Sequence, residues 1–198
     1  FIINTQTFTT ENDYVNEPDV PDKLGYSGKW ENYSLSTSDI TVNAIYTPIT
    51  YTVTFKAGDT VVDTQTYTVE NNDIAPPDAP TKTGYAVAWE HYELTVGDVI
   101  VNAVYTPEKY NVTLNYDGAT SGNTQQTVTV TYDLPIGKLP MPEKTGYNFI
   151  GWYYGSKLVT SDTVWNYDAD NAEFTARWST DEFTVTFLAD GKIIDIQT

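Results

Sequence analysis

The single histidine, His91, is the side chain best suited to moving protons near neutral pH. It lies in the run Trp89-Glu90-His91-Tyr92-Glu93. A histidine-based catalytic centre also needs a nucleophile and an orienting carboxylate beside the imidazole. The equivalent position in an earlier copy of the same sequence pattern is Asn32, so the histidine does not recur. A solvent-exposed residue at a strand end is the favoured interpretation, and we predict that the chain is not an enzyme.

Acidic side chains dominate the charge. The 198 residues hold 27 Asp and Glu against 10 Lys and Arg, a net charge of −17 at pH 7. Two carboxylates can hydrolyse a glycosidic bond, but no pattern marks a pair, and solvated faces that keep molecules apart are the simpler interpretation. Nucleic acid needs clustered cations, and anionic lipid repels such a chain. We predict no nucleic-acid partner and, since no apolar run approaches the roughly 20 residues of a span, no membrane insertion.

Calcium is the strongest cofactor candidate. The stretch Asp168-Ala169-Asp170-Asn171-Ala172-Glu173 offers oxygen ligands at alternate positions. An EF-type loop also needs a glycine at its sixth position and a glutamate at its twelfth, and both are absent. The alternative is an ordinary acidic turn before a strand. No residue is cysteine, so thiolate metal sites are excluded, and we predict no cofactor and no metal.

Aromatic side chains could instead form a sugar-stacking surface. Most of the 5 Trp and 16 Tyr occupy recurring positions, where they are better explained as core. Tyr153, Tyr154 and Trp165 lie in a longer segment that does not recur. They are the best candidates for an exposed ligand-binding patch, with packing inside a hairpin as the alternative.

An internal repeat sets the organisation of the chain. Thr5-Gln6-Thr7-Phe8-Thr9 matches Thr64-Gln65-Thr66-Tyr67-Thr68 at an offset of 64 − 5 = 59 residues. Within a copy, apolar and polar residues alternate, as along 51–56, which is typical of half-buried strands. Prolines break the segments between strands. The glycine before Tyr26, Tyr85 and Tyr147 predicts a turn with positive φ.

These copies predict a mostly β chain with little helix. We expect a repeat at 1–48 that lacks its first strand, a complete short repeat at 49–107, a longer repeat at 108–179 and the start of a further repeat at 180–198. Residues 193–198 align with residues 2–7, so both ends fall inside a copy. We therefore expect the chain to be an excerpt of a longer tandem array.

The third copy carries a family pattern. It runs Val112-Thr113-Leu114-Asn115-Tyr116-Asp117-Gly118, continues through Pro140-Met141-Pro142-Glu143-Lys144-Thr145-Gly146-Tyr147-Asn148-Phe149-Ile150-Gly151-Trp152-Tyr153 and closes on Phe174-Thr175-Ala176-Arg177-Trp178. This pattern resembles the Listeria–Bacteroides repeat, the B-repeat module of internalin-like bacterial surface proteins. Residues 1–107 look like a shorter relative, because their copies lack the Gly-Trp-Tyr and end in Tyr-Thr-Pro.

The resemblance implies tandem β-grasp-like modules arranged as an elongated array in a secreted, often wall-attached bacterial protein. It implies no catalytic residues. The expected function is a stalk, a spacer or a weak adhesive array at the extracellular cell surface. The alternative is a module for carbohydrate or host protein centred on the third repeat.

The two ends of the chain suggest one further partner, another copy of itself. The first repeat lacks its first strand, which leaves an unpaired sheet edge. Residues 183–198 carry the missing strand type. Strand addition between copies could then give head-to-tail self-association.

Overall fold

The computed structural model describes residues 4–9, 11, 14–169, 171–180 and 182–197. Within those residues the protein is all-β, with thirteen strands and no helix. The chain divides into two compact units, Phe1–Pro80 with Ala88–Val104, and Thr81–Val87 with Tyr105–Thr198. No helical segment in the described part of the chain has the length and hydropathy of a membrane span. The β-rich expectation is confirmed, whereas the β-grasp-like topology stays a prediction.

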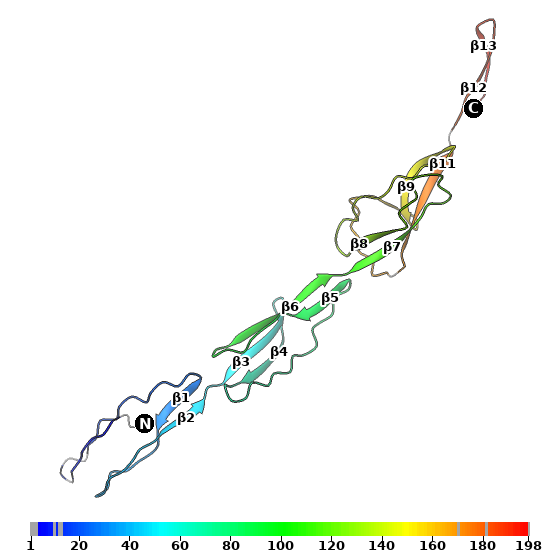
Figure 1. Cartoon of the computed structure of the whole chain (residues 1–198). Helices are drawn as coiled ribbons and strands as arrows, with labels where there is room; N and C mark the ends of the chain where they lie inside the picture. The colour runs from blue at the N-terminus through cyan, green and yellow to red at the C-terminus, as the bar shows by residue number, and fades with distance from the viewer. Residues whose placement is uncertain (1–3, 10, 12–13, 170, 181, 198) are drawn as a thin grey trace. The chain divides into compact units, whose positions relative to one another are not determined.

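The strands form four separate sheets (Figure 1). The first sheet is an antiparallel pair, β1 (Tyr26–Trp30) and β2 (Ala44–Pro48). The second has the order β4-β3-β6-β5 and is built from β3 (Tyr51–Ala57), β4 (Thr60–Tyr67), β5 (Tyr85–Trp89) and β6 (Val99–Pro107).

The third sheet has five strands in the order β10-β9-β11-β7-β8. Its strands are β7 (Lys109–Asn115), β8 (Thr127–Thr131), β9 (Tyr147–Tyr154), β10 (Lys157–Val159) and β11 (Glu173–Thr180). The fourth is a hairpin of β12 (Val185–Ala189) and β13 (Lys192–Gln197).

The second and third sheets share one plan. In each, a hairpin's first strand also pairs in parallel with the last strand of the copy, β3 with β6 and β7 with β11. A parallel pair needs a long crossover connection, and here the proline-rich segments and the strand β5 or β9 supply it. The repeat seen in the sequence is therefore a repeat of sheet topology.

Buried and exposed side chains alternate along the strands, and the buried ones form two hydrophobic cores. Along β7 the residues Tyr110, Val112 and Leu114 point inward and their neighbours outward, as a strand with one buried face requires. The larger core holds thirteen buried residues: Tyr110, Val112, Leu114, Tyr116, Val128, Val130, Ile136, Trp152, Val159, Trp165, Ala172, Phe174 and Ala176. The smaller core holds four: Val53, Phe55, Tyr67 and Val101.

The predicted glycine turns are confirmed. Gly25, Gly84 and Gly146 have φ of 79°, 75° and 81°, a region that L side chains rarely adopt. Each of these glycines directly precedes the tyrosine that opens β1, β5 or β9.

Candidate functional site

Trp165 was expected on an exposed patch, and that expectation is wrong. Its side chain is only 1% exposed. The indole packs against Tyr154, Tyr167 and Phe174, with ring centroids 5.3, 5.0 and 5.8 Å away. Its backbone is tied to Leu134 by an N–H···O bond of 3.0 Å. The longer segment of the third repeat folds inward because burying a large indole stabilises the module, so the hairpin-packing alternative describes Trp165.

The two tyrosines lie on opposite faces of β9. Tyr154 is half-buried in the Trp165 cluster, 4.9 Å from the Tyr167 ring. Tyr153 is half-buried on the other face, where the Arg177 guanidinium lies 4.1 Å from its ring centroid. Arg177 also donates to the carbonyl of Gly155 at 2.7 Å. Leu158, which pairs with Tyr153 across β10, is 52% exposed. Tyr153, Leu158 and Arg177 are named here the Tyr153 face; ligand binding there stays a prediction.

The described residues assemble no catalytic centre around His91. Its imidazole lies 4.0 Å from Glu93, and both side chains are highly exposed.

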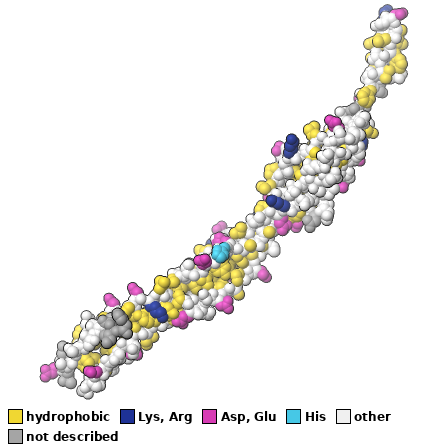
Figure 2. Space-filling model, viewed as in Figure 1, with side chains coloured by type: hydrophobic (Ala, Val, Ile, Leu, Met, Phe, Trp, Pro, Cys, Tyr) yellow, Lys and Arg dark blue, Asp and Glu magenta, His cyan; other side chains and the backbone are white. Residues whose placement is uncertain are grey.

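Among the described residues no group of His, Cys, Asp and Glu could hold a metal ion. Asp170 of the predicted calcium stretch lies outside the described residues. On the face shown in Figure 2, acidic side chains are dispersed and few Lys or Arg side chains lie among them.

Among the groups with shifted pKa values, the Asp98 carboxyl and the Tyr110 hydroxyl are shifted for structural reasons. Asp98 accepts a 2.8 Å bond from the backbone N–H of Thr52, which lowers the pKa of its carboxyl. Burial raises the pKa of the Tyr110 hydroxyl, whose single proton is shared between the carboxylates of Glu108 at 2.8 Å and Asp168 at 3.1 Å. Asp98 joins two neighbouring segments of one sheet and Tyr110 ties a loop to a strand, so neither marks a reaction centre.

A tryptophan–proline bond recurs in all three repeats. In each, the indole N–H donates to the carbonyl oxygen of the proline 12 residues earlier, at 2.6 to 2.7 Å. The pairs are Trp30 with Pro18, Trp89 with Pro77 and Trp152 with Pro140. This bond fastens the strand-free proline segment to the sheet and satisfies a donor that is expensive to bury alone. The sequence shows that tryptophans recur at matching positions, but it does not show which acceptor each indole bonds to.

A lysine–tyrosine contact also recurs. The ammonium groups of Lys23, Lys82 and Lys144 lie 3.5, 3.6 and 4.7 Å from the ring centroids of Tyr26, Tyr85 and Tyr147. Cation–π contacts of this kind contribute about 0.5–1 kcal/mol at exposed sites. The lysine precedes the glycine turn in each copy, so it clamps that turn to the following strand.

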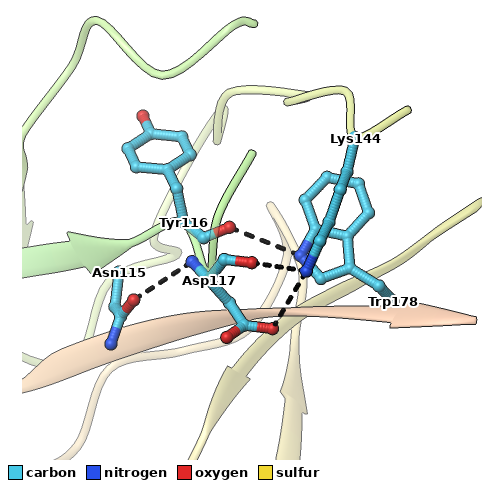
Figure 3. Close-up of polar contacts among 5 residues, drawn as sticks. All are labelled: Asn115, Tyr116, Asp117, Lys144 and Trp178. Carbon is cyan, nitrogen blue, oxygen red and sulfur yellow. Dashed lines mark hydrogen bonds and ion pairs between the residues drawn. The ribbon is translucent and has the colours of Figure 1, made fainter. Parts of the chain in front are cut away.

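In the third repeat this lysine also closes a loop (Figure 3). Lys144 donates to the carbonyl oxygen of Asp117 at 2.7 Å and lies 3.8 Å from its carboxylate. The Trp178 indole donates to the Tyr116 carbonyl at 3.3 Å, and Asn115 accepts from the Asp117 N–H at 3.1 Å. Asp117 sits at a φ of 48°. The contacts drawn in Figure 3 hold the chain after β7, which makes this arrangement a structural lock.

The tyrosine after the glycine turn of one repeat contacts the segment that follows the second strand of the next repeat. Within the first unit the Tyr26 hydroxyl donates to Glu70 at 2.9 Å. Within the second unit the Tyr85 hydroxyl donates to Asp133 at 2.7 Å. The Tyr85 ring also packs edge-on against Tyr132, with centroids 5.6 Å apart. These two pairs are named here the junction contacts. In the sequence, an acidic residue shortly after the second strand of each copy, Glu70 or Asp133, is the feature that could have predicted these contacts.

The sheets and the repeated contacts define an all-β repeat protein. The family model of the Listeria-Bacteroides repeat domain matches residues 51–89 and 110–180. The chain belongs to this family, whose repeats are typical of bacterial surface proteins. The chain is also similar to a protein of Evansella cellulosilytica named "Putative membrane protein", 28% identical over 201 residues. That alignment covers 87% of this chain and 29% of the relative. Both similarities point to the bacterial cell envelope.

Proposed function

We propose that this chain is a non-catalytic segment of an extracellular bacterial surface protein, where it serves as an elongated stalk or spacer and a weak adhesive array. Its repeats are 1–48, 49–107, 108–179 and the beginning of another at 180–198. The observation that carries the proposal is the recurrence of the junction contacts. A spacer needs neighbouring repeats to hold one orientation, and these contacts are repeated where consecutive copies meet.

The connections between copies support the same function. Ile49 and Thr50 alone separate β2 from β3, and Glu108 alone separates β6 from β7. The N–H groups of Ile49 and Glu108 donate to the carbonyls of Gly25 and Gly84, both at 2.9 Å. Short connections whose backbone is already hydrogen-bonded leave little hinge freedom.

The negative net charge is compatible with many copies of the chain lying close together on one cell surface. At −17 the chains repel one another over about a Debye length, roughly 8 Å at physiological ionic strength. Repulsion keeps neighbouring molecules apart and limits non-specific contact.

Small-angle scattering of the chain at low concentration tests the stalk. A single compact globule of this length would have a radius of gyration of about 16 Å, and we expect a value well above that. The double variant Tyr26→Phe with Tyr85→Phe removes both junction hydroxyls and is expected to broaden the distance distribution. Tyr147→Phe, at the equivalent tyrosine of the third repeat, is the control. A wild-type radius near that of a globule would contradict the proposal.

A second candidate function, carbohydrate or host-protein binding by the third repeat, is supported by the Tyr153 face. An aromatic ring beside a guanidinium and an exposed leucine resembles the mixed surfaces that bind other molecules. A glycan array and a panel of host extracellular proteins test it, with Tyr153→Ala expected to abolish the signal. The control is Tyr147→Ala, because Tyr147 is 42% exposed outside that face. Equal signals from the two variants would contradict binding at the Tyr153 face.

A further inference from the structure

A row of side chains crosses the outer face of the five-stranded sheet. Each member pairs with the next on a neighbouring strand: Leu158 on β10, Tyr153 on β9, Thr175 on β11 and Asn115 on β7. None of these residues belongs to the buried core, because alternate residues of a strand face opposite sides of a sheet. Neighbouring strands lie about 4.8 Å apart, so the row is about 14 Å long. These residues are named here the outer row.

The outer row ends at an open polar recess of about 400 Å³. Asn115 lines it together with Glu173 of β11 and with Asn123 and Gln126 of the loop before β8. The Glu173 carboxylate accepts hydrogen bonds from the Asn115 amide at 3.0 Å and from the Thr175 hydroxyl at 3.3 Å. These bonds orient the carboxylate before any ligand arrives, which lowers the entropy cost of binding.

The side chains of this surface keep donors and acceptors for a ligand. Both bonds to Glu173 end on Oε1, and no described residue bonds to Oε2. The Asn115 amide uses one N–H for Glu173 and its oxygen for the Asp117 N–H (Figure 3), which leaves its second N–H. The Arg177 guanidinium is held by the Gly155 carbonyl and the Tyr153 ring, and no carboxylate of a described residue pairs with it.

The fold does not require these polar groups. In the four-stranded sheet β3 pairs in parallel with β6 in the same register as β7 with β11. There a lysine and two exposed aliphatic residues take the places of the amide, the carboxylate and the guanidinium. The equivalents of Asn115, Glu173 and Arg177 are Lys56, Ile100 and Val104. Since one backbone accepts both sets, the polar set of the third repeat is explained by binding rather than by folding.

We propose that the outer row and the polar recess together bind a neutral oligosaccharide. This inference rests on the second candidate function, binding by the third repeat, and names its ligand class. A pyranose ring has apolar C–H faces and hydroxyl edges, and such a site combines apolar surface with a few oriented polar groups. Tyr153 and Leu158 contact a C–H face, while the Glu173 carboxylate and the Asn115 amide bond to hydroxyl groups.

The length and the charge of the surface narrow the ligand further. A row of about 14 Å spans more than one sugar ring, so an oligosaccharide makes contacts that a monosaccharide cannot make. An acidic glycan would bring its carboxylate close to Glu173 in the recess. It would also approach a chain with a net charge of −17. The preferred glycan is therefore uncharged.

A glycan array probed with the 198-residue chain tests the ligand class. It carries neutral glucose, mannose and N-acetylglucosamine oligosaccharides, their monosaccharides, oligogalacturonate and sialylated glycans. We expect signal on neutral oligosaccharides and at least about tenfold weaker signal on the matching monosaccharides and on the acidic glycans. Preference for an acidic glycan would overturn the proposal. A monosaccharide that binds as tightly as its oligosaccharide would overturn it as well, because the row would then have no role.

Matched variants at two asparagines of β7 test the site. Asn115→Ala and Glu173→Gln are expected to lower the affinity for the strongest neutral array ligand at least about tenfold by calorimetry. Asn111→Ala is the control and should leave the affinity unchanged. Asn111 is exposed on the same face and accepts from Thr129 at 2.9 Å, but it lies outside the outer row. Equal affinities of the two asparagine variants would overturn the assignment.

An NMR titration with the same oligosaccharide locates the contact without relying on variants. Shifts are expected at the amides of Tyr153, Thr175 and Asn115, and the four-stranded sheet should not respond. Shifts confined to other strands would overturn the proposal. Circular dichroism verifies that the variants used in calorimetry are folded.

The experiments separate this inference from the candidate function on which it rests. If Tyr153→Ala abolishes glycan binding while Asn115→Ala and Glu173→Gln retain it, the third repeat binds glycan but the outer row is not the site. If a host protein binds and no glycan does, the oligosaccharide is wrong and the candidate function stands. If neither glycan nor host protein binds, both are wrong.

Discussion

The four-stranded sheet of residues 51–107 and the five-stranded sheet of residues 109–180 are built on one plan but differ in their interiors. The first encloses four buried residues and the second thirteen. The key tryptophan shows the consequence, since Trp89 is half-buried while Trp152 is only 2% exposed. The five-stranded sheet is the longer copy, and its extra length adds β10 and the buried Trp165.

The difference in the number of buried residues shows how a small module gains stability. A domain of about 60 residues buries a modest fraction of its surface and is marginal alone. The shorter copy relies on the junction contacts and on recurring polar clamps. The longer copy adds a second aromatic layer, in which Tyr154 and Trp165 pack with centroids 5.3 Å apart. We therefore expect the five-stranded region to unfold at a higher denaturant concentration than the four-stranded one.

The largest expected effect is at Trp165. Trp165→Ala should destabilise the five-stranded region by about 3–5 kcal/mol, because it leaves a cavity where three rings now pack. Trp165→Phe should cost less, about 1–2 kcal/mol, since a ring stays and the substitution removes the indole N–H, which has no hydrogen-bond partner among the described residues. Urea unfolding followed by residue-resolved NMR measures both. A four-stranded region that weakens equally would show that the two cores are not independent.

The next effect distinguishes two glycine turns of the same kind. A Cβ at Gly84 would lie 2.2 Å from the Tyr132 ring, whereas at Gly146 it would meet nothing within 4 Å. Gly146→Ala carries only the cost of a positive φ, about 1–2 kcal/mol. Gly84→Ala adds a steric clash and should cost about 2–4 kcal/mol. Thermal unfolding of the two variants compares them. Equal losses would mean that the Tyr132 ring moves aside without cost.

A smaller effect tests the recurring tryptophan–proline bond. Trp89→Phe keeps a ring but removes the donor that bonds to the Pro77 carbonyl at 2.6 Å, a loss of about 1 kcal/mol. Trp152→Phe removes the equivalent bond from a buried site and should cost more, about 1–3 kcal/mol. Hydrogen exchange of the β5 and β9 amides reports each loss locally. If Trp89→Phe proved the costlier variant, the polar clamp rather than burial would dominate in the shorter copy.

The repeat and its strands could be predicted because they depend on local pattern. Alternation along residues 51–56 predicted which side chains of β3 face the core, and the glycine before each tyrosine predicted a positive φ. The family resemblance on residues 109–178 is borne out by the family match. These features need only neighbouring residues, so one sequence suffices.

Pairing over long sequence distances could not be predicted. Trp165 was expected at the surface because it does not recur, yet its burial depends on packing with Phe174 and on a backbone bond to Leu134. The tyrosine–carboxylate junctions join residues 44 and 48 positions apart. Such contacts require the sheet order, which periodicity does not give.

The smallest expected effect concerns the parallel pairing of β3 with β6. The Thr52 N–H lowers the pKa of Asp98, so the folded state holds the ionised carboxylate more strongly than the unfolded state does. The resulting stability is fully present above the unfolded pKa, about 4, and is lost as the pH falls through the lower folded pKa. Asp98→Asn removes this dependence, so the gap in unfolding free energy between wild type and variant should narrow below about pH 4. Asp59→Asn makes the same change of net charge in the β3–β4 turn. A gap that stays constant down to acid pH would mean that the Thr52 bond does not distinguish the charged carboxylate, and that main-chain pairing alone holds β3 to β6.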